Sequence, residues 1–190
     1  MIARRAFGML AIAAAIALAA EVRADVPLPD GAKTITLIGA SGERVAIGTA
    51  TFTRAEDGAS FEIALDPKRF QDEFLSMRPF SCLASDKEMW CHLAYPYDLK
   101  RKITARDLTD LEYALLFLFK PPAGYGIDPW NGLYFKMSLQ DDGVVAGELH
   151  DVNLDPLGTP PADRSARTIT PDQLTKSDAA SRRFSRVEIK

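Results

Sequence analysis

The sequence predicts a mainly β fold, in the form of a small antiparallel barrel or a sandwich with two or three short helices. Short stretches in which apolar and polar residues alternate recur along the chain, and Asp-Gly and other turn signals separate them. Two cysteines also occupy facing positions in one expected hairpin, which a disulfide would staple. An α+β arrangement of the same elements is the alternative.

The first part of the domain indicates an antiparallel meander of three strands. Ser41-Gly42 and Asp57-Gly58 supply its two turns, because glycine accepts the backbone angles of tight turns. The three alternating stretches are residues 34–38, 44–53 and 59–65.

Residues 68–77 follow this meander with a different pattern. Phe70, Phe74 and Met77 are spaced at i, i+4 and i+7, which is the spacing of one helical face. The stretch therefore predicts one short helix or a loop with buried aromatic side chains.

Cys82 and Cys91 lie in two expected strands, residues 80–84 and 89–93, with Asp86-Lys87 as the two-residue turn between them. In that register the cysteines are directly opposite, with Cα atoms about 4.5–5.5 Å apart, which a disulfide tolerates. Closing so short a loop should contribute about 2–3 kcal/mol to stability. A redox-active or metal-binding pair is the alternative, but it would need a C-x-x-C motif or further ligands.

Residues 104–119 predict a short helix followed by a buried strand. Thr104 suits the N-cap position, and the leucine spacing continues through about Tyr113. Residues 114–119 are apolar on all sides, so periodicity alone fits a buried helix end as well as a core strand. Three acidic side chains are expected to face solvent at the start of this helix, where its dipole favours negative charge: Asp107, Asp110 and Glu112.

Two further strands complete a β domain over residues 25–158. They are expected at residues 133–139 and 144–154, with a hairpin turn at Asp141-Asp142-Gly143. Residues 159–190 then form a Pro-rich connection, a short helix and a C-terminal tail.

The C-terminal segment carries two signals of its own. Thr170 and Gln173 form a capping box around Pro171, which predicts the start of a short helix. Residues 184–189 either add an edge strand or stay loose.

Residues 1–24 have the order of a secretory signal peptide. Arg4 and Arg5 precede an apolar run of about 14 residues, which is shorter than the roughly 20 needed to span a bilayer as a helix. Cleavage is expected after Ala24, so the protein is expected in the periplasm or outside the cell, and a retained anchor is the alternative. The arginine pair followed by Phe7 partly matches a twin-arginine signal, which leaves open whether the chain is exported folded or unfolded.

Charge and composition exclude some partners. Cleavage after residue 24 would leave 166 of the 190 residues, with 20 basic and 25 acidic side chains and a net charge near −5. A net acidic chain is a poor partner for nucleic acid or an anionic membrane surface, so neither is expected. The sequence indicates no cofactor, and no integral membrane segment after signal cleavage.

The two histidines are weak candidates for chemistry. His92 faces Ser81 in the expected hairpin, and a Ser–His pair occurs in hydrolases, although the chain has no Gly-x-Ser-x-Gly motif. Residues 150–155, which begin with His150, have the oxygen spacing that opens a calcium loop but lack its required Gly and Glu. We therefore predict no metal site and regard His92 only as a weak catalytic candidate.

The most distinctive pattern is aromatic. Loops on a rigid β scaffold usually carry binding, and aromatic faces beside polar groups suit ring-bearing ligands such as sugars, and also protein partners. The alternative is that these rings cap the ends of the core. The candidate binding residues, all in or beside Gly/Pro-rich loops, are Tyr95, Tyr97, Tyr125, Asp128, Trp130, Asn131 and Tyr134.

Three functions are consistent with these observations, in order of preference. The first is a non-enzymatic exported module that binds a small ligand or an envelope protein through the loops 95–102 and 122–132. The second is a cell-envelope hydrolase with His92 as base. The third is a structural accessory protein, which would expose a contiguous apolar patch.

Overall fold

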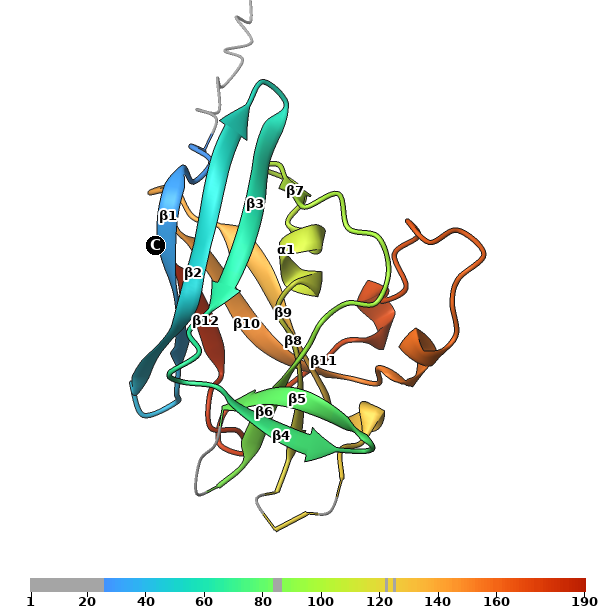
Figure 1. Ribbon diagram of the computed structural model, residues 1–190. Helices are drawn as coiled ribbons and strands as arrows, with labels where there is room; N and C mark the ends of the chain where they lie inside the picture. The colour runs from blue at the N-terminus through green and yellow to red at the C-terminus, as the bar shows by residue number, and fades with distance from the viewer. Residues whose placement is uncertain (1–25, 84–86, 122, 125) are drawn as a thin grey trace, which may run out of the picture.

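In the computed structural model, the chain forms one antiparallel sheet that curls around a hydrophobic core (Figure 1). The structure describes residues 26–83, 87–121, 123–124 and 126–190. Within these residues the sheet has twelve strands in the order β4-β5-β6-β8-β9-β10-β12-β1-β2-β3-β7, with β11 paired to β10 outside that path. The prediction of a mainly β, antiparallel fold is confirmed.

The strands follow the alternating stretches of the sequence and add several short ones. Their bounds are β1 (Gly31–Ile38), β2 (Arg44–Ala55), β3 (Gly58–Leu65), β4 (Gln71–Leu75), β5 (Arg78–Leu83), β6 (Met89–Leu93), β7 (Lys102–Ile103), β8 (Leu116–Lys120), β9 (Gly132–Leu139), β10 (Val145–Val152), β11 (Thr175–Lys176) and β12 (Arg186–Ile189). The helical elements of the described residues are α1 (Thr109–Tyr113) and three short 3-10 turns, η1 (Pro129–Asn131), η2 (Asp155–Gly158) and η3 (Pro171–Gln173).

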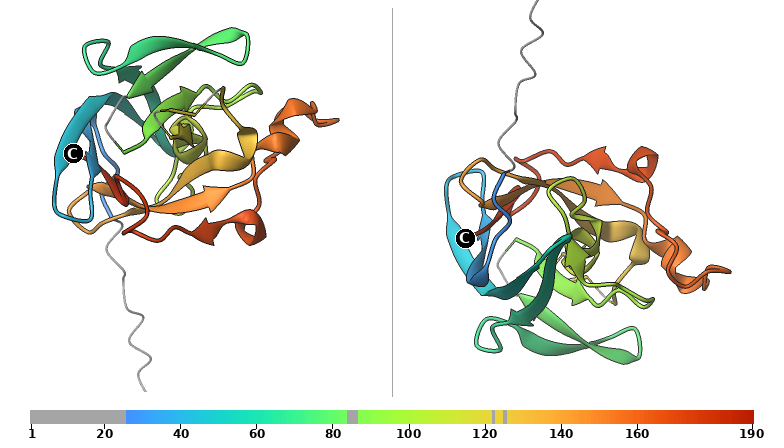
Figure 2. Two further views of the ribbon diagram at one scale, coloured as in Figure 1. Left: turned by 90° about the horizontal axis from the view of Figure 1, so that it is seen from below. Right: turned by 90° about the horizontal axis from the view of Figure 1, so that it is seen from above.

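The curl of the sheet brings β3 and β8 into one core. Phe61 of β3 and Phe117 of β8 belong to the same buried cluster, and Trp90 of β6 is fully buried within it. The indole of Trp90 contacts the rings of Phe117, Phe135 and Phe184, with centroid separations of 5.8, 6.2 and 5.3 Å. Helix α1 contacts both β7 and β9 and lies inside the curve of the sheet when the molecule is viewed end-on (Figure 2).

The C-terminal strand β12 takes an interior position in the sheet, and is neither an edge strand nor a loose tail. It pairs with β1 on one side and β10 on the other, so that Ile189 lies opposite both Ile35 and Val145. Phe184, Val187 and Ile189 are fully buried. Val187 and Ile189, which alternate with the polar residues Arg186 and Glu188, contribute to the main core from this interior strand.

The prediction for residues 68–77 is wrong, because β4 and β5 form a hairpin there. Ser76 and Met77 make its turn with positive φ angles of 48° and 67°. Phe70 is buried, whereas Phe74 and Met77 are 75% and 91% exposed. The helical spacing of the three residues is coincidental, since pairing with β5 satisfies the backbone groups that a helix would have used.

Helix α1 ends where the sequence predicted but begins later. Its N-cap is Leu108, whereas Thr104, four residues before this N-cap, forms an isolated bridge with Asp107. The apolar residues after Tyr113 form strand β8, which resolves the ambiguity of residues 114–119 in favour of a strand. The expected C-terminal helix is a single 3-10 turn, η3, in which the Gln173 side chain accepts a 2.7 Å bond from the Thr170 amide.

Candidate functional site

A second apolar cluster lies on the face of the sheet opposite the main core. Strand β8 shows the division, because Leu116 and Leu118 belong to this outer cluster while Phe117 between them belongs to the main core. Side chains from beyond β10, including Leu154 and Leu157, pack on the same face. The outer cluster therefore gives the sheet a second buried surface, which is where loops can shape a site.

Part of the outer cluster is open to solvent as a groove of about 380 Å³, here called the outer groove. This volume falls within the range of small-molecule sites, roughly 300–1,000 Å³. A ligand in the outer groove would contact mainly apolar side chains. Those that line it are Phe80, Leu93, Leu118, Ile127, Leu154 and Leu157.

Two walls of the outer groove come from the loops that the sequence analysis singled out. Pro96 belongs to the loop 95–102, and Ile127 and Pro129 belong to the loop 122–132. The fold therefore brings these two loops to one groove, although the aromatic residues expected to bind are mostly not the ones that line it.

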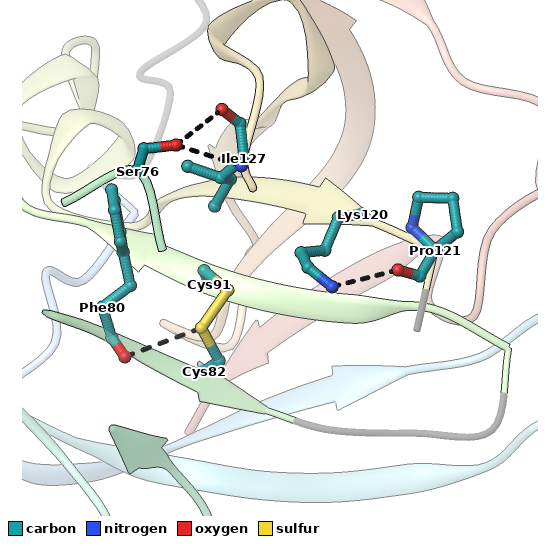
Figure 3. Close-up of a disulfide and its surroundings, with 7 residues drawn as sticks. All are labelled: Ser76, Phe80, Cys82, Cys91, Lys120, Pro121 and Ile127. Atoms are coloured by element: carbon teal, nitrogen blue, oxygen red, sulfur yellow. Dashed lines mark hydrogen bonds between the residues drawn. A yellow bond between two sulfur atoms is a disulfide. The ribbon is translucent and has the colours of Figure 1, made fainter. Parts of the chain in front are cut away.

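A further wall is the tip of the β4–β5 hairpin. The Oγ of Ser76 lies 3.3 Å from the carbonyl oxygen of Ile127, to which it donates, and accepts a 3.2 Å bond from the Ile127 amide. Figure 3 shows this pair of bonds beside Phe80 and the disulfide. The hairpin tip is thereby fastened to the loop before η1.

Two charged side chains line the outer groove. Arg78 begins β5, and its guanidinium carbon lies 4.6 Å from the ring centroid of Phe80. Asp155 begins η2 on the other side. Within the described residues neither side chain forms an ion pair, with the other or with a third group, so both charges are available to a ligand.

The disulfide between Cys82 and Cys91 is confirmed and lies in the outer cluster. Its cysteines are directly opposed in the β5–β6 pair, with Cα atoms 3.9 Å apart, which is closer than expected. The expected turn at Asp86-Lys87 lies partly outside the described residues. The Sγ of Cys82 lies 3.6 Å from the carbonyl oxygen of Phe80 (Figure 3). The disulfide thus ties β5 to β6, and both strands contribute residues to the outer groove, Arg78 and Phe80 from β5 and Leu93 from β6.

Three of the predicted binding tyrosines belong to the outer cluster but do not line the outer groove. The hydroxyl of Tyr97 donates to the Leu157 carbonyl over 2.6 Å, that of Tyr134 donates to Glu112, and that of Tyr95 shares a 3.0 Å bond with Thr168. Burial raises the pKa of Tyr134 and Tyr95. Tyr95 and Tyr97 thereby attach the segment after β10 to the loop after β6, whereas Tyr134 attaches β9 to α1. Tyr125, a fourth candidate, lies outside the described residues.

The remaining predicted residues belong to η1. The Oδ1 of Asp128 accepts a 2.9 Å bond from the Trp130 amide and so caps this turn, and Asn131 ends it half-buried. Trp130 is 67% exposed beside Pro129, a groove residue. Together with Phe74 and Met77 it makes up the exposed large apolar side chains of the residues that the structure describes.

The ring of His92 makes contacts within the protein. Its Nε2 lies 3.0 Å from the Ala114 carbonyl oxygen, and its ring packs edge-on against Phe117. Burial lowers the pKa of His92. It lines a separate hollow of about 190 Å³ between β3 and the loop after β6, and in the described part of the chain it bonds no hydroxyl or carboxylate. The hydrolase hypothesis stays a prediction.

The segment 150–155 shows ordinary structural contacts. Asp151 binds Arg182 through bonds of 2.8 and 3.2 Å, and the Oδ1 of Asn153 accepts the Asp155 amide over 2.9 Å. His150 Nδ1 lies 3.1 Å from the Glu148 carbonyl oxygen. Among the described residues, no group of three or more His, Cys, Asp or Glu side chains is arranged to hold a metal ion.

One buried acid differs from its expected placement. Glu112 of α1, expected to face solvent, is fully buried and accepts bonds from the Tyr134 hydroxyl, from the Met137 amide over 2.7 Å and from Lys136 over 3.1 Å. Its carboxylate thereby binds α1 to β9. Glu112 is 22 to 25 residues from its partners on β9, so no local pattern could reveal this contact.

The sequence analysis also missed the groove residues Arg78 and Asp155. Each stands in an ordinary polar setting at the start of a short element, and no spacing rule connects them. The one usable signal was the convergence of Gly/Pro-rich loops, which located the groove but not its lining.

No protein-family model, curated protein or solved structure matches this chain. Within the described residues, no helix is long and apolar enough to cross a bilayer. The function therefore has to be inferred from the chemistry of the outer groove.

Proposed function

We propose that the protein is an exported, non-enzymatic binding module that holds a small ligand with an apolar body in the outer groove. One observation carries the proposal, an open groove of about 380 Å³ with an apolar floor where two loops and a hairpin tip converge. Apolar surface left open in a concave site gains free energy when a ligand covers it, at about 25 cal/mol per Å².

Export is supported by the covalent chemistry of the chain. A disulfide such as Cys82–Cys91 forms and persists in oxidising compartments, which include the periplasm and the extracellular space. Residues 1–24, which lie outside the described residues, have the signal-peptide pattern. The ligand is therefore expected among small molecules of the cell envelope or its surroundings.

The composition of the groove supports binding over catalysis. The polar side chains that line it are Ser76, Arg78 and Asp155, and Ser76 is engaged by Ile127. Nucleophilic catalysis needs a nucleophile within hydrogen-bond reach of a base, and the lining of the outer groove supplies no such pair.

The proposal is tested by filling the groove. A Cβ added at Gly158, which lines the outer groove, would have no heavy atom within 4 Å, so a side chain can start there without a clash and Gly158→Phe adds a ring at the groove. The mature protein is titrated with N-phenyl-1-naphthylamine, an uncharged apolar probe whose fluorescence rises on binding. We expect saturable binding to the wild type and affinity weakened about tenfold or more, equivalent to about 1.4 kcal/mol, in Gly158→Phe.

Ala105→Phe is the matched control, because Ala105 is exposed and does not line the outer groove. It should bind the probe as the wild type does. Absence of saturable binding to the wild type, or equal loss in both variants, would refute the proposed function.

A further inference from the structure

We infer that the ligand of the outer groove is a short apolar peptide with free termini, whose carboxylate is bound by Arg78 and whose ammonium is bound by Asp155. This inference rests on the proposed function of the groove. It adds the chemical class of the ligand and assigns a role to each of the two charges.

The position of Arg78 suits it to bind a carboxylate group of the ligand. Its guanidinium lies over the ring of Phe80, which holds the side chain against the groove floor. A guanidinium presents two parallel N–H donors that match the two oxygens of a carboxylate. Arg44, Arg167 and Arg182 each form an ion pair with an acidic side chain of the protein, whereas Arg78 has no such partner among the described residues.

Asp155 is the complementary group. Its backbone amide is held by Asn153, so the residue is fixed at the start of η2 while its side chain stays exposed. Asp155 and Arg78 line the same groove without forming an ion pair with each other, so the two charges lie apart. Each charge therefore offers a separate anchoring point.

A ligand with a single charge would be attracted by one of these groups and repelled by the other. A carboxylate bound by Arg78, for example, is repelled by Asp155. A ligand that carries both an anionic and a cationic group matches both. The apolar lining of the groove, which includes Leu118 and Leu154, adds contact with the apolar side chains of such a ligand. A free amino acid bears both charges on one carbon atom, whereas a short peptide separates them and carries apolar side chains between. The groove thus favours a short apolar peptide.

The test compares four forms of one dipeptide by isothermal titration calorimetry. Leu-Leu carries both charges, N-acetyl-Leu-Leu only the carboxylate, Leu-Leu amide only the ammonium, and N-acetyl-Leu-Leu amide neither. We expect Leu-Leu to bind tightest and each blocked terminus to weaken binding about tenfold, as for one charge-assisted hydrogen-bonded contact.

Variants then assign each charge. Arg78→Gln should remove the advantage of the free carboxylate and retain that of the ammonium, and Asp155→Asn should do the reverse. Both side chains are exposed, so neither change disturbs the core. Arg69→Gln and Asp172→Asn, which alter exposed residues outside the groove, are the matched controls and should bind all four peptides as the wild type does.

The outcomes separate this inference from the proposed function. Equal binding of the four peptides, or tighter binding of a singly charged form, would overturn the assignment of a peptide with two free termini. So would the failure of every peptide to bind while N-phenyl-1-naphthylamine still binds, and the groove would then keep its proposed function. If neither the peptides nor N-phenyl-1-naphthylamine bind to the wild type, both the peptide assignment and the proposed function of the groove are overturned.

Discussion

Ser76 is fastened to Ile127, 51 residues further along the chain, by two hydrogen bonds through a single hydroxyl oxygen. This contact joins the β4–β5 turn to the loop before η1, and both segments line the outer groove. The turn itself has left-handed backbone angles at Ser76 and Met77, so its shape is set locally and its position is set by Ile127. This contact therefore helps to hold one wall of the outer groove, together with the packing of Leu75 on the outer cluster.

We predict that Ser76→Ala loosens that wall with little effect on global stability. An exposed hydrogen bond of this kind contributes about 1 kcal/mol or less. Amide exchange at Ile127 and its neighbours should become faster, because this amide loses its acceptor. Hydrogen–deuterium exchange followed by mass spectrometry measures the exchange rate of the peptides that contain Ile127.

Ser60→Ala is the control for Ser76→Ala. The Ser60 hydroxyl bonds the Thr53 carbonyl at an exposed position far from the groove in the strand order. This variant should leave exchange at Ile127 unchanged. Identical exchange at Ile127 in wild type and Ser76→Ala would contradict the assigned contact.

We predict that Cys82→Ser lowers the free energy of unfolding by about 2–3 kcal/mol, because the unfolded chain is no longer restricted by the disulfide. The effect is of this size because the closed loop is short, with a sequence separation of 9. Urea denaturation under oxidising conditions measures the difference. Reductant should destabilise the wild type to a similar level and leave the variant unchanged. Equal stability of the two oxidised proteins would mean that the thiols are unpaired in solution.

We predict that Glu112→Gln destabilises the fold by about 1.5–3 kcal/mol, the value of hydrogen bonds to a charged group. The groups that converge on Glu112 are all donors: the Tyr134 hydroxyl, the Met137 amide and Lys136. A glutamine has only one acceptor oxygen, so its NH₂ group would face a donor. The midpoint of urea denaturation reports the loss.

Glu148→Gln is the matched control for Glu112→Gln. Glu148 pairs with Lys176 over 2.7 Å, but both side chains are more than half exposed. Because solvent screens this exposed pair, its substitution should destabilise the fold clearly less than Glu112→Gln does. If the two variants lose the same stability, the buried carboxylate does not have the role described.

We predict an acid sensitivity that originates from His92. Burial lowers the pKa of His92 below its ordinary 6.5, so at slightly acidic pH the unfolded chain binds a proton that the folded protein does not. The free energy of unfolding should therefore decrease as pH falls below about 6.5, with a slope of at most about 1.4 kcal/mol per pH unit. Denaturation at pH 7.5 and 5.5 measures this slope.

His92→Gln should remove most of that slope, since glutamine can still donate to the Ala114 carbonyl but does not titrate. The carboxyl groups with lowered pKa values, such as Asp107 and Glu148, titrate at lower pH. His150→Gln, which removes the other histidine, should retain the slope. A slope that persists in His92→Gln would assign it to other groups.

The strands and the disulfide were predictable because they depend on local patterns. Alternation placed β1, β2, β3, β9 and β10, and the turn between two strands placed Cys82 opposite Cys91. The errors came from partners that a local pattern does not contain. Phe74 and Met77 followed helical spacing, but pairing with β5 decided their conformation, and the position of β12 depended on two strands distant in the sequence.

The candidate site was predictable only as a region. Gly/Pro-rich loops indicated where ligands would reach the scaffold, and Pro96 and Pro129 do line the groove. Aromatic character was a poor guide to individual residues, because Tyr97 and Tyr134 have hydroxyl groups that find partners inside the protein. A tyrosine in a loop is as well suited to anchoring that loop as to binding a ligand.

The interior position of β12 constrains the order in which the strands of the sheet can pair during folding. Strands β1–β3 and β8–β10 join into one continuous sheet only through residues 186–189, which lie between β1 and β10. During synthesis, which proceeds from the N-terminus, strands β1–β3 and β8–β10 therefore form two separate sheets with unpaired edges. They are joined only when residues 186–189 pair with both. Closure of the sheet is a late event that joins the first and last strands, and such long-range pairing is slow compared with local folding.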